Sequence, residues 1–230
     1  MEISPEVNGI SPAAVSLPLS ESRPSLHAAN PVVPAEAASA FAERPSPRAT
    51  AQERRQAASD KNQRMDELLD LPSIPADYGA TMVALYRDDT QDVLTRDFAV
   101  QHIGLYAQAL HRAGSYDAGS DDARLCRTAL LDAAGETGTI VAAAAFRALS
   151  DLAGFDSHIE AGRLDEMLVS CAGDGAASTA ARVMAVQLCG ERAIASSRAS
   201  LGHILDDPSA PVPLRKAAQW SLSRLEKDSP

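Results

Sequence analysis

The chain contains few aromatic residues, few cysteines and no long uninterrupted apolar segment. Aromatic side chains make up only 4% of its 230 residues, although 45% of the residues are hydrophobic. Any core must therefore consist mainly of Ala, Leu, Val and Ile, and closely packed helices suit such side chains. No apolar run reaches the roughly 18 residues that cross a bilayer, so no membrane-spanning segment is expected.

The three cysteines, Cys126, Cys171 and Cys189, stand far apart in the sequence. Neither a disulfide framework nor a CxxC site is therefore indicated, and the thiols are expected to be small buried apolar groups. The first 30 residues lack a basic start followed by an apolar stretch, and Pro5 and Pro12 interrupt them, so no standard signal peptide is expected. Cytoplasmic localisation is the default prediction.

Positive charge is also in short supply. The chain has 21 Lys and Arg residues against 31 Asp and Glu residues, which gives a formal net charge of −10. Nucleic-acid and anionic membrane surfaces attract basic proteins, so both are excluded as main partners. The acidic balance instead favours a protein or peptide partner with basic character.

Sequence motifs of catalysis are missing. The five histidines are scattered, none in HExxH or beside a cysteine at ligand spacing, so no zinc site is expected. The motifs GxGxxG, GxxxxGK[ST] and GxSxG do not occur, which leaves nucleotide binding and serine-hydrolase chemistry without support. We therefore predict a non-enzymatic protein that needs no cofactor.

Two acidic features have simple structural interpretations. The stretch "DAGSDD" at residues 117–122 resembles the start of a calcium loop, but the twelfth position holds Thr128 where a glutamate is required. It is expected to be an ordinary loop that leads into a helix. The carboxylate pairs Asp88 with Asp89 and Asp206 with Asp207 fall at turns, where we expect them to cap the next helix.

The N-terminal part differs in composition from the rest. Residues 1–60 hold eight of the 14 prolines and a single aromatic side chain. Such a composition buries too little apolar surface to fold alone, so residues 1–49 are predicted to be a disordered tail. Residues 50–71 begin with Thr50 and Glu53 in capping-box spacing and are predicted to form a lead-in helix that caps the domain.

Residues 76–227 show internal repetition. Four helical segments superpose when one alanine of each is aligned: Ala99, Ala145, Ala185 and Ala218. The residue four positions later is always apolar: Ile103, Leu149, Cys189 and Leu222. The residue five positions later is always small: Gly104, Ser150, Gly190 and Ser223. Each segment follows another apolar-periodic segment, so four helix pairs are predicted, and pairs of this kind bury their apolar faces by stacking.

The last unit carries a known repeat pattern in Asp207, Pro208, Val212, Arg215, Ala217, Ala218 and Leu222. This pattern resembles the HEAT repeat of the HEAT and armadillo-like α-solenoids. The first unit follows it with Asp89, Val93, Arg96, Ala99 and Ile103, and the third with Asp174, Arg182 and Ala185. The second unit lacks both the arginine and the turn proline. The resemblance covers roughly residues 76–227.

The resemblance implies an all-α fold, a short right-handed α-α superhelix of about four helix pairs, in which second helices line the concave face of a scaffold. In this family the equivalent arginines connect neighbouring repeats. A structural role is therefore expected for Arg96, Arg182 and Arg215.

One row of the second helices departs from the buried pattern. Two residues after each aligned alanine stand Gln101, Arg147, Gln187 and Trp220, roughly 200° around the helix. Trp220 is the only tryptophan, and tryptophan is enriched at interface hot spots. We predict a partner-contact strip that consists of Trp220, Gln187, Gln101, Lys216 and Gln219. The alternative is that the chain's own termini cover Trp220, or that it is simply exposed in a terminal unit.

The leading functional prediction is a non-enzymatic scaffold or adaptor that binds a protein or peptide. The alternative is an exported bacterial protein whose disordered N-terminus resembles a type III secretion signal. A remote alternative is a bilin lyase-like HEAT protein, which would need a small-molecule ligand in its groove. HEAT-like enzymes that excise DNA bases need a basic, aromatic surface, which this sequence does not offer.

Overall fold

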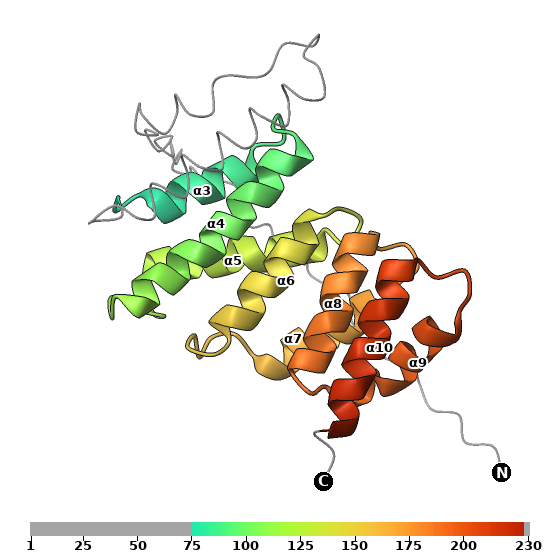
Figure 1. The fold of residues 1–230 in the computed structure, drawn as a ribbon. Coiled ribbons are helices and arrows are strands. Elements are labelled where there is room, and N and C mark those ends of the chain that lie inside the picture. The colour runs from blue at the N-terminus through green and yellow to red at the C-terminus, as the bar shows by residue number, and fades with distance from the viewer. Residues whose placement is uncertain (1–74, 228–230) are drawn as a thin grey trace, which may run out of the picture. The chain divides into compact units, whose positions relative to one another are not determined.

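The computed structural model describes residues 75–227, and all regular structure in this part of the chain is helical, as predicted (Figure 1). The α-helices are α3 (Tyr78–Arg87), α4 (Val93–Arg112), α5 (Asp121–Gly135), α6 (Val141–Leu152), α7 (Ala161–Gly173), α8 (Thr179–Glu191), α9 (Arg198–Asp206) and α10 (Val212–Lys227). A short 3-10 helix, η1 (Ala195–Ser197), precedes α9. The predicted tail at residues 1–49 and the predicted lead-in helix at residues 50–71 lie outside the described residues.

The helices pack as four consecutive pairs. Helix α3 packs on α4, α5 on α6, α7 on α8, and α9 on α10. The second helices also pack on one another in the series α4, α6, α8 and α10, which Figure 1 shows side by side. These four are the segments that the aligned alanines identified. None of the helices in residues 75–227 is long and apolar enough to cross a membrane.

Alanine lies at the centre of the core. The four aligned alanines, Ala99, Ala145, Ala185 and Ala218, are each 0% exposed. Of the four apolar positions one turn later, three are fully buried and Leu222 is partly buried against the core. All three cysteines are buried and unpaired, as predicted. The second helices therefore meet through small side chains, which lets their backbones approach closely.

The small position five residues after the alanine marks two of these close approaches. A Cβ atom added to Gly104 of α4 would lie 2.6 Å from the Cβ of Ala148 on α6. A Cβ atom added to Gly190 of α8 would lie 2.7 Å from the Cα of Ser221 on α10. Real Cβ atoms essentially never approach other atoms so closely, so glycine is required for the observed helix separation at both sites.

Short polar side chains begin three of the helices. Asp92 accepts a hydrogen bond from the backbone N of Thr95 at the start of α4, and Ser120 and Ser178 cap α5 and α8 in the same way. The expectation that Asp88 and Asp89 cap α4 is wrong. Asp88 instead accepts hydrogen bonds from Thr90 within the turn. It lies too early in the chain to cap α4, because the turn contains several further residues before the helix begins. Asp207 likewise accepts from the backbone N of Ser209, and α10 begins only at Val212.

Candidate functional site

A groove of about 480 Å³ lies over the second helices, where α4, α6 and α8 meet. Its floor consists of the small residues Gly104, Ala143, Ala144 and Ala148, and longer side chains of all three helices form its sides. We call this feature the central groove. Its volume is within the range of about 300–1,000 Å³ that is typical of ligand-binding pockets.

Two contacts fix the direction of the helices along the central groove. Gly104 lies against Ala148, and one turn later Gln108 donates a hydrogen bond to Asp151 over 3.0 Å. Residue numbers thus increase in the same direction on α4 and α6. Asp97 lies eleven residues before Gln108, which at 1.5 Å per residue is about 16 Å away along the helix. The groove therefore has one carboxylate, Asp97 or Asp151, toward each end.

These two carboxylates have different surroundings. Asp151 accepts a hydrogen bond from Gln108 and lies 4.0 Å from the guanidinium of Arg147. Asp97 accepts a hydrogen bond from Nε2 of Gln101 at 2.8 Å, and no cationic side chain of residues 75–227 forms an ion pair with it. Burial raises the pKa of Asp97, opposed only by the hydrogen bond from Gln101. Burial also raises the pKa of Asp151, although Arg147 and Gln108 act against it.

Arg147, the one cationic residue in the lining, is already engaged. Its guanidinium donates two hydrogen bonds to Glu191 of α8, at 2.6 and 3.0 Å. This bidentate geometry is the strong form of the arginine–carboxylate pair, and the hydrogen bond from Arg147 lowers the pKa of Glu191. The groove therefore carries a net negative charge. The charge of its one arginine is balanced by Glu191, which lies outside the lining, whereas Asp97 and Asp151 both lie in the lining.

The structure separates the residues of the predicted partner-contact strip. Gln101 lines the central groove, together with Arg147 of the same row. Gln187 is partly buried on α8 and does not line the groove, whereas Lys216 and Gln219 are exposed on α10. Trp220 is 42% exposed, and the guanidinium carbon of Arg224 lies 5.3 Å from the centre of its ring. The strip is thus divided among Gln101 in the groove, Gln187 on α8 outside the groove, and the exposed residues of α10.

The three arginines expected to be structural make unequal contacts. Nε of Arg96 donates to the backbone O of Tyr86 at 2.9 Å, and its Nη2 donates to Glu136 at 2.6 Å. This side chain therefore joins α3 and α4 to the end of α5. Nε of Arg182 donates to the backbone O of Ala172, ten residues earlier, on α7. Nε of Arg215 is buried without a hydrogen-bond partner.

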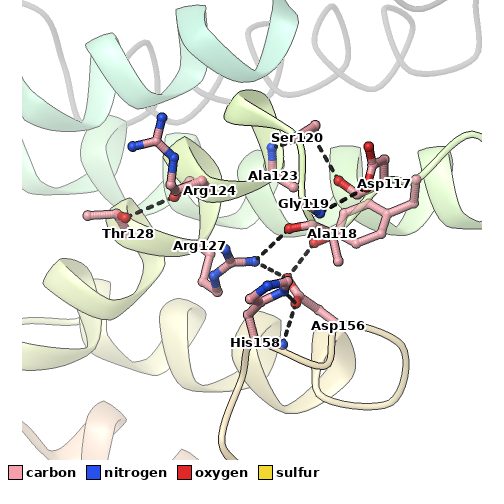
Figure 2. A network of polar contacts seen from close by, with 11 residues as sticks. Asp117, Ala118, Gly119, Ser120, Ala123, Arg124, Arg127, Thr128, Asp156 and His158 are labelled. Carbon is pink, nitrogen blue, oxygen red and sulfur yellow. Dashed lines mark hydrogen bonds and ion pairs between the residues drawn. The ribbon is translucent and has the colours of Figure 1, made fainter.

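A buried carboxylate with no sequence motif around it lies in the loop between α6 and α7, beside α5 (Figure 2). The side chain of Asp156 is 0% exposed and accepts hydrogen bonds from Tyr116 at 2.7 Å, from Arg127 at 2.6 Å and from the backbone N of His158 at 2.9 Å. Burial alone would raise the pKa of Asp156, but these hydrogen bonds and the Arg127 charge outweigh it and lower the pKa. A carboxylate so fully engaged joins loops rather than exchanging protons with a ligand.

The loop beside Asp156 has the predicted structure. Asp117 accepts a hydrogen bond from the backbone N of Gly119, and Ser120 then caps α5 through Ala123 (Figure 2). Residues 117–120 are therefore a loop that leads into α5, and Asp121 and Asp122 form the first turn of that helix. No group of three His, Cys, Asp or Glu side chains within residues 75–227 is placed to hold a metal ion.

Sequence reasoning missed most of the central groove. Asp97, Leu105, Asp151 and Met184 line it, yet none was selected. One signal was present: Asp97, Gln101 and Leu105 recur every four residues and thus share one face of α4. Without knowledge of the α4–α6 contact, this face looked like an ordinary solvated surface.

Comparison of the chain with protein-family models, curated proteins and solved structures found no match.

Proposed function

We propose that residues 76–227 form a short right-handed HEAT-like solenoid that binds a protein or peptide partner. The partner-binding face is the exposed side of α4, α6, α8 and α10, which carries Gln101, Arg147, Gln187 and Trp220. The series of contacts among the second helices supports a solenoid, since repeat proteins pack each unit on its neighbours. The same repetition leaves one surface continuous across the units.

One observation carries the proposal. Ala218 of α10 is 0% exposed, whereas Trp220, two residues later, is 42% exposed. The tryptophan is thus directed away from the core. Its position in the row is the one that Gln101 and Arg147, which line the central groove, occupy on α4 and α6. A large aromatic side chain that leaves apolar surface in contact with water in the free protein contributes strongly to binding when a partner covers it.

The test compares capture of binding proteins by three immobilised chains: wild type, Trp220→Ala and Val212→Ala. Val212 is a suitable control because it is 53% exposed on the same helix but does not belong to the row. We expect Trp220→Ala to lose at least about fivefold of the recovery of a specific partner, as for a hot-spot residue, while Val212→Ala retains it. Equal recovery of every partner by all three chains would remove Trp220 from the proposed face.

Raised salt provides a second measurement. An acidic face that attracts a basic partner should release it as ionic strength increases, since screening weakens such attraction. Recovery that stays constant from low to high salt would contradict the basic character of the partner.

A further inference from the structure

The central groove has an unusual combination of a small apolar floor and a carboxylate without a cation. We infer that it holds a short extended segment of a basic peptide, and that a lysine or arginine side chain of this segment pairs with Asp97. This inference rests on the proposed function and names the chemistry that the face selects.

The shape of the groove favours an extended segment. Its floor of Gly104, Ala143, Ala144 and Ala148 lets a peptide backbone approach the helices closely. Its length of about 16 Å between the levels of Asp97 and Gln108 accommodates about five residues at 3.3 Å each. A helix of about 10 Å diameter would enclose about 1,200 Å³ over that length, so most of it would stand outside a groove of about 480 Å³.

The charges favour a cation at the Asp97 end. A half-buried carboxylate is costly to desolvate, and the neutral amide of Gln101 compensates it only in part. A guanidinium or ammonium group would offset this cost by a charge-assisted hydrogen bond. At the other end, Gln108 and Arg147 already contact Asp151. The groove is thus asymmetric, with its free negative charge at Asp97.

An anionic or neutral segment would gain less. The only guanidinium in the lining, on Arg147, donates two hydrogen bonds to Glu191 and would have to break them to bind a carboxylate. A neutral segment would cover the Asp97 carboxylate without replacing its hydration, which is unfavourable. Leu105, which is 36% exposed beside the alanine floor, offers apolar contact to the rest of the segment.

The experiment measures binding of fluorescein-labelled heptapeptide pools to the full chain by fluorescence polarisation. One position at a time is fixed as Arg, Lys, Gln or Glu, and the other positions are a mixture of Ala, Leu and Ser. We expect one position at which the Arg or Lys pool binds about tenfold more tightly than the Gln and Glu pools, as for a partly buried charge pair. Asp97→Asn should abolish this preference, and Asp97→Arg should reverse it toward Glu.

Asp206→Asn provides the matched control. Asp206 is an exposed carboxylate at the end of α9, remote in the fold from the α4–α6 contact, so this variant should bind like wild type. Circular dichroism should show the same helix content for Asp97→Asn and Asp206→Asn as for wild type, since an asparagine at position 97 can still accept the hydrogen bond from Gln101.

The outcomes separate this inference from the proposed function. If wild type binds peptides without preferring Lys or Arg, or if Asp97→Asn keeps the preference, the assignment of Asp97 is wrong while partner binding stands. If wild type binds no pool at millimolar peptide, the groove is not a peptide site, and only failed capture of folded partners would remove the proposed function as well. If Arg54→Glu with Arg55→Glu increases peptide affinity about tenfold, the chain's own basic residues 44–64 occupy the groove, which also overturns the inference.

Discussion

Replacement of Gly104 by alanine tests whether the close approach of α4 and α6 determines stability. Alanine favours a helix interior over glycine by about 1 kcal/mol, so an unconstrained site would gain that amount. At Gly104, however, the new Cβ would lie 2.6 Å from the Cβ of Ala148. Ordinary contact begins near 3.4 Å, so the helices must separate by nearly 1 Å, which forfeits about a quarter to a half of the local dispersion energy.

Overpacking of this kind costs about 1–3 kcal/mol. After subtraction of the helix-propensity gain, we expect Gly104→Ala to lower the free energy of unfolding by up to about 2 kcal/mol. Urea denaturation followed by circular dichroism at 222 nm measures this difference. Gly202→Ala is the control, because Gly202 lies inside α9 with no atom within 4 Å of the added Cβ. That variant should gain about 0.5–1 kcal/mol.

A swap of the two residues makes the test decisive. Gly104→Ala combined with Ala148→Gly moves the methyl group from one helix to the other and restores the contact. We expect the double variant to return to within about 0.5 kcal/mol of wild type, although each single change is destabilising. If Gly104→Ala gains stability as Gly202→Ala does, or if the two single effects simply add, the helices are not held at the separation that the structure shows.

Three further predictions concern the interior. Asp156→Asn should lower the free energy of unfolding by about 3 kcal/mol at pH 7, because it leaves Arg127 buried without its carboxylate. Since the folded-state pKa of Asp156 is lowered, this stabilisation is complete above about pH 4 and is lost as the pH falls through the lowered pKa. Urea titrations from pH 7 to pH 3 should therefore show a steeper loss of stability in wild type than in the variant. Arg96→Ala should cost about 2 kcal/mol, and Arg215→Ala less than half as much, because only Arg96 has partners for both its Nε and its Nη2; equal losses in thermal melts would refute the difference. Burial raises the pKa of the Cys126 thiol to about 12 and those of the other two to about 11, so a thiol reagent at pH 8 should modify the three cysteines in denaturant and leave them unmodified in the folded chain.

The repeats were predictable because packing between helices constrains single positions. The column that holds Gly104 and Gly190 contained only small residues, and both glycines do mark close helix contacts. Asp97 and Asp156 gave no comparable signal. The first becomes special only when α6 places alanines beside it, and the second, which lies in a loop, only when Arg127 of α5 reaches it.

The hydrogen bonds within the turns were the other feature that the sequence alone did not predict. Asp88 has the residue type that caps helices, and type alone suggested that role. The position of a cap depends on how many residues the turn needs, and four more residues follow before α4 begins at Val93 with Asp92 as its cap. Local composition therefore located the turns but not the hydrogen bonds within them.

Helix α6 has a consequence for how the chain unfolds. It belongs to the unit that departs most from the repeat pattern, yet within residues 75–227 the helices before it and those after it pack on α6 far more than on each other. Cooperativity between the two ends must therefore pass largely through this one helix. Weakened packing of α6 would divide a single unfolding transition into two, and hydrogen exchange would then report separate opening free energies for α3–α5 and α7–α10.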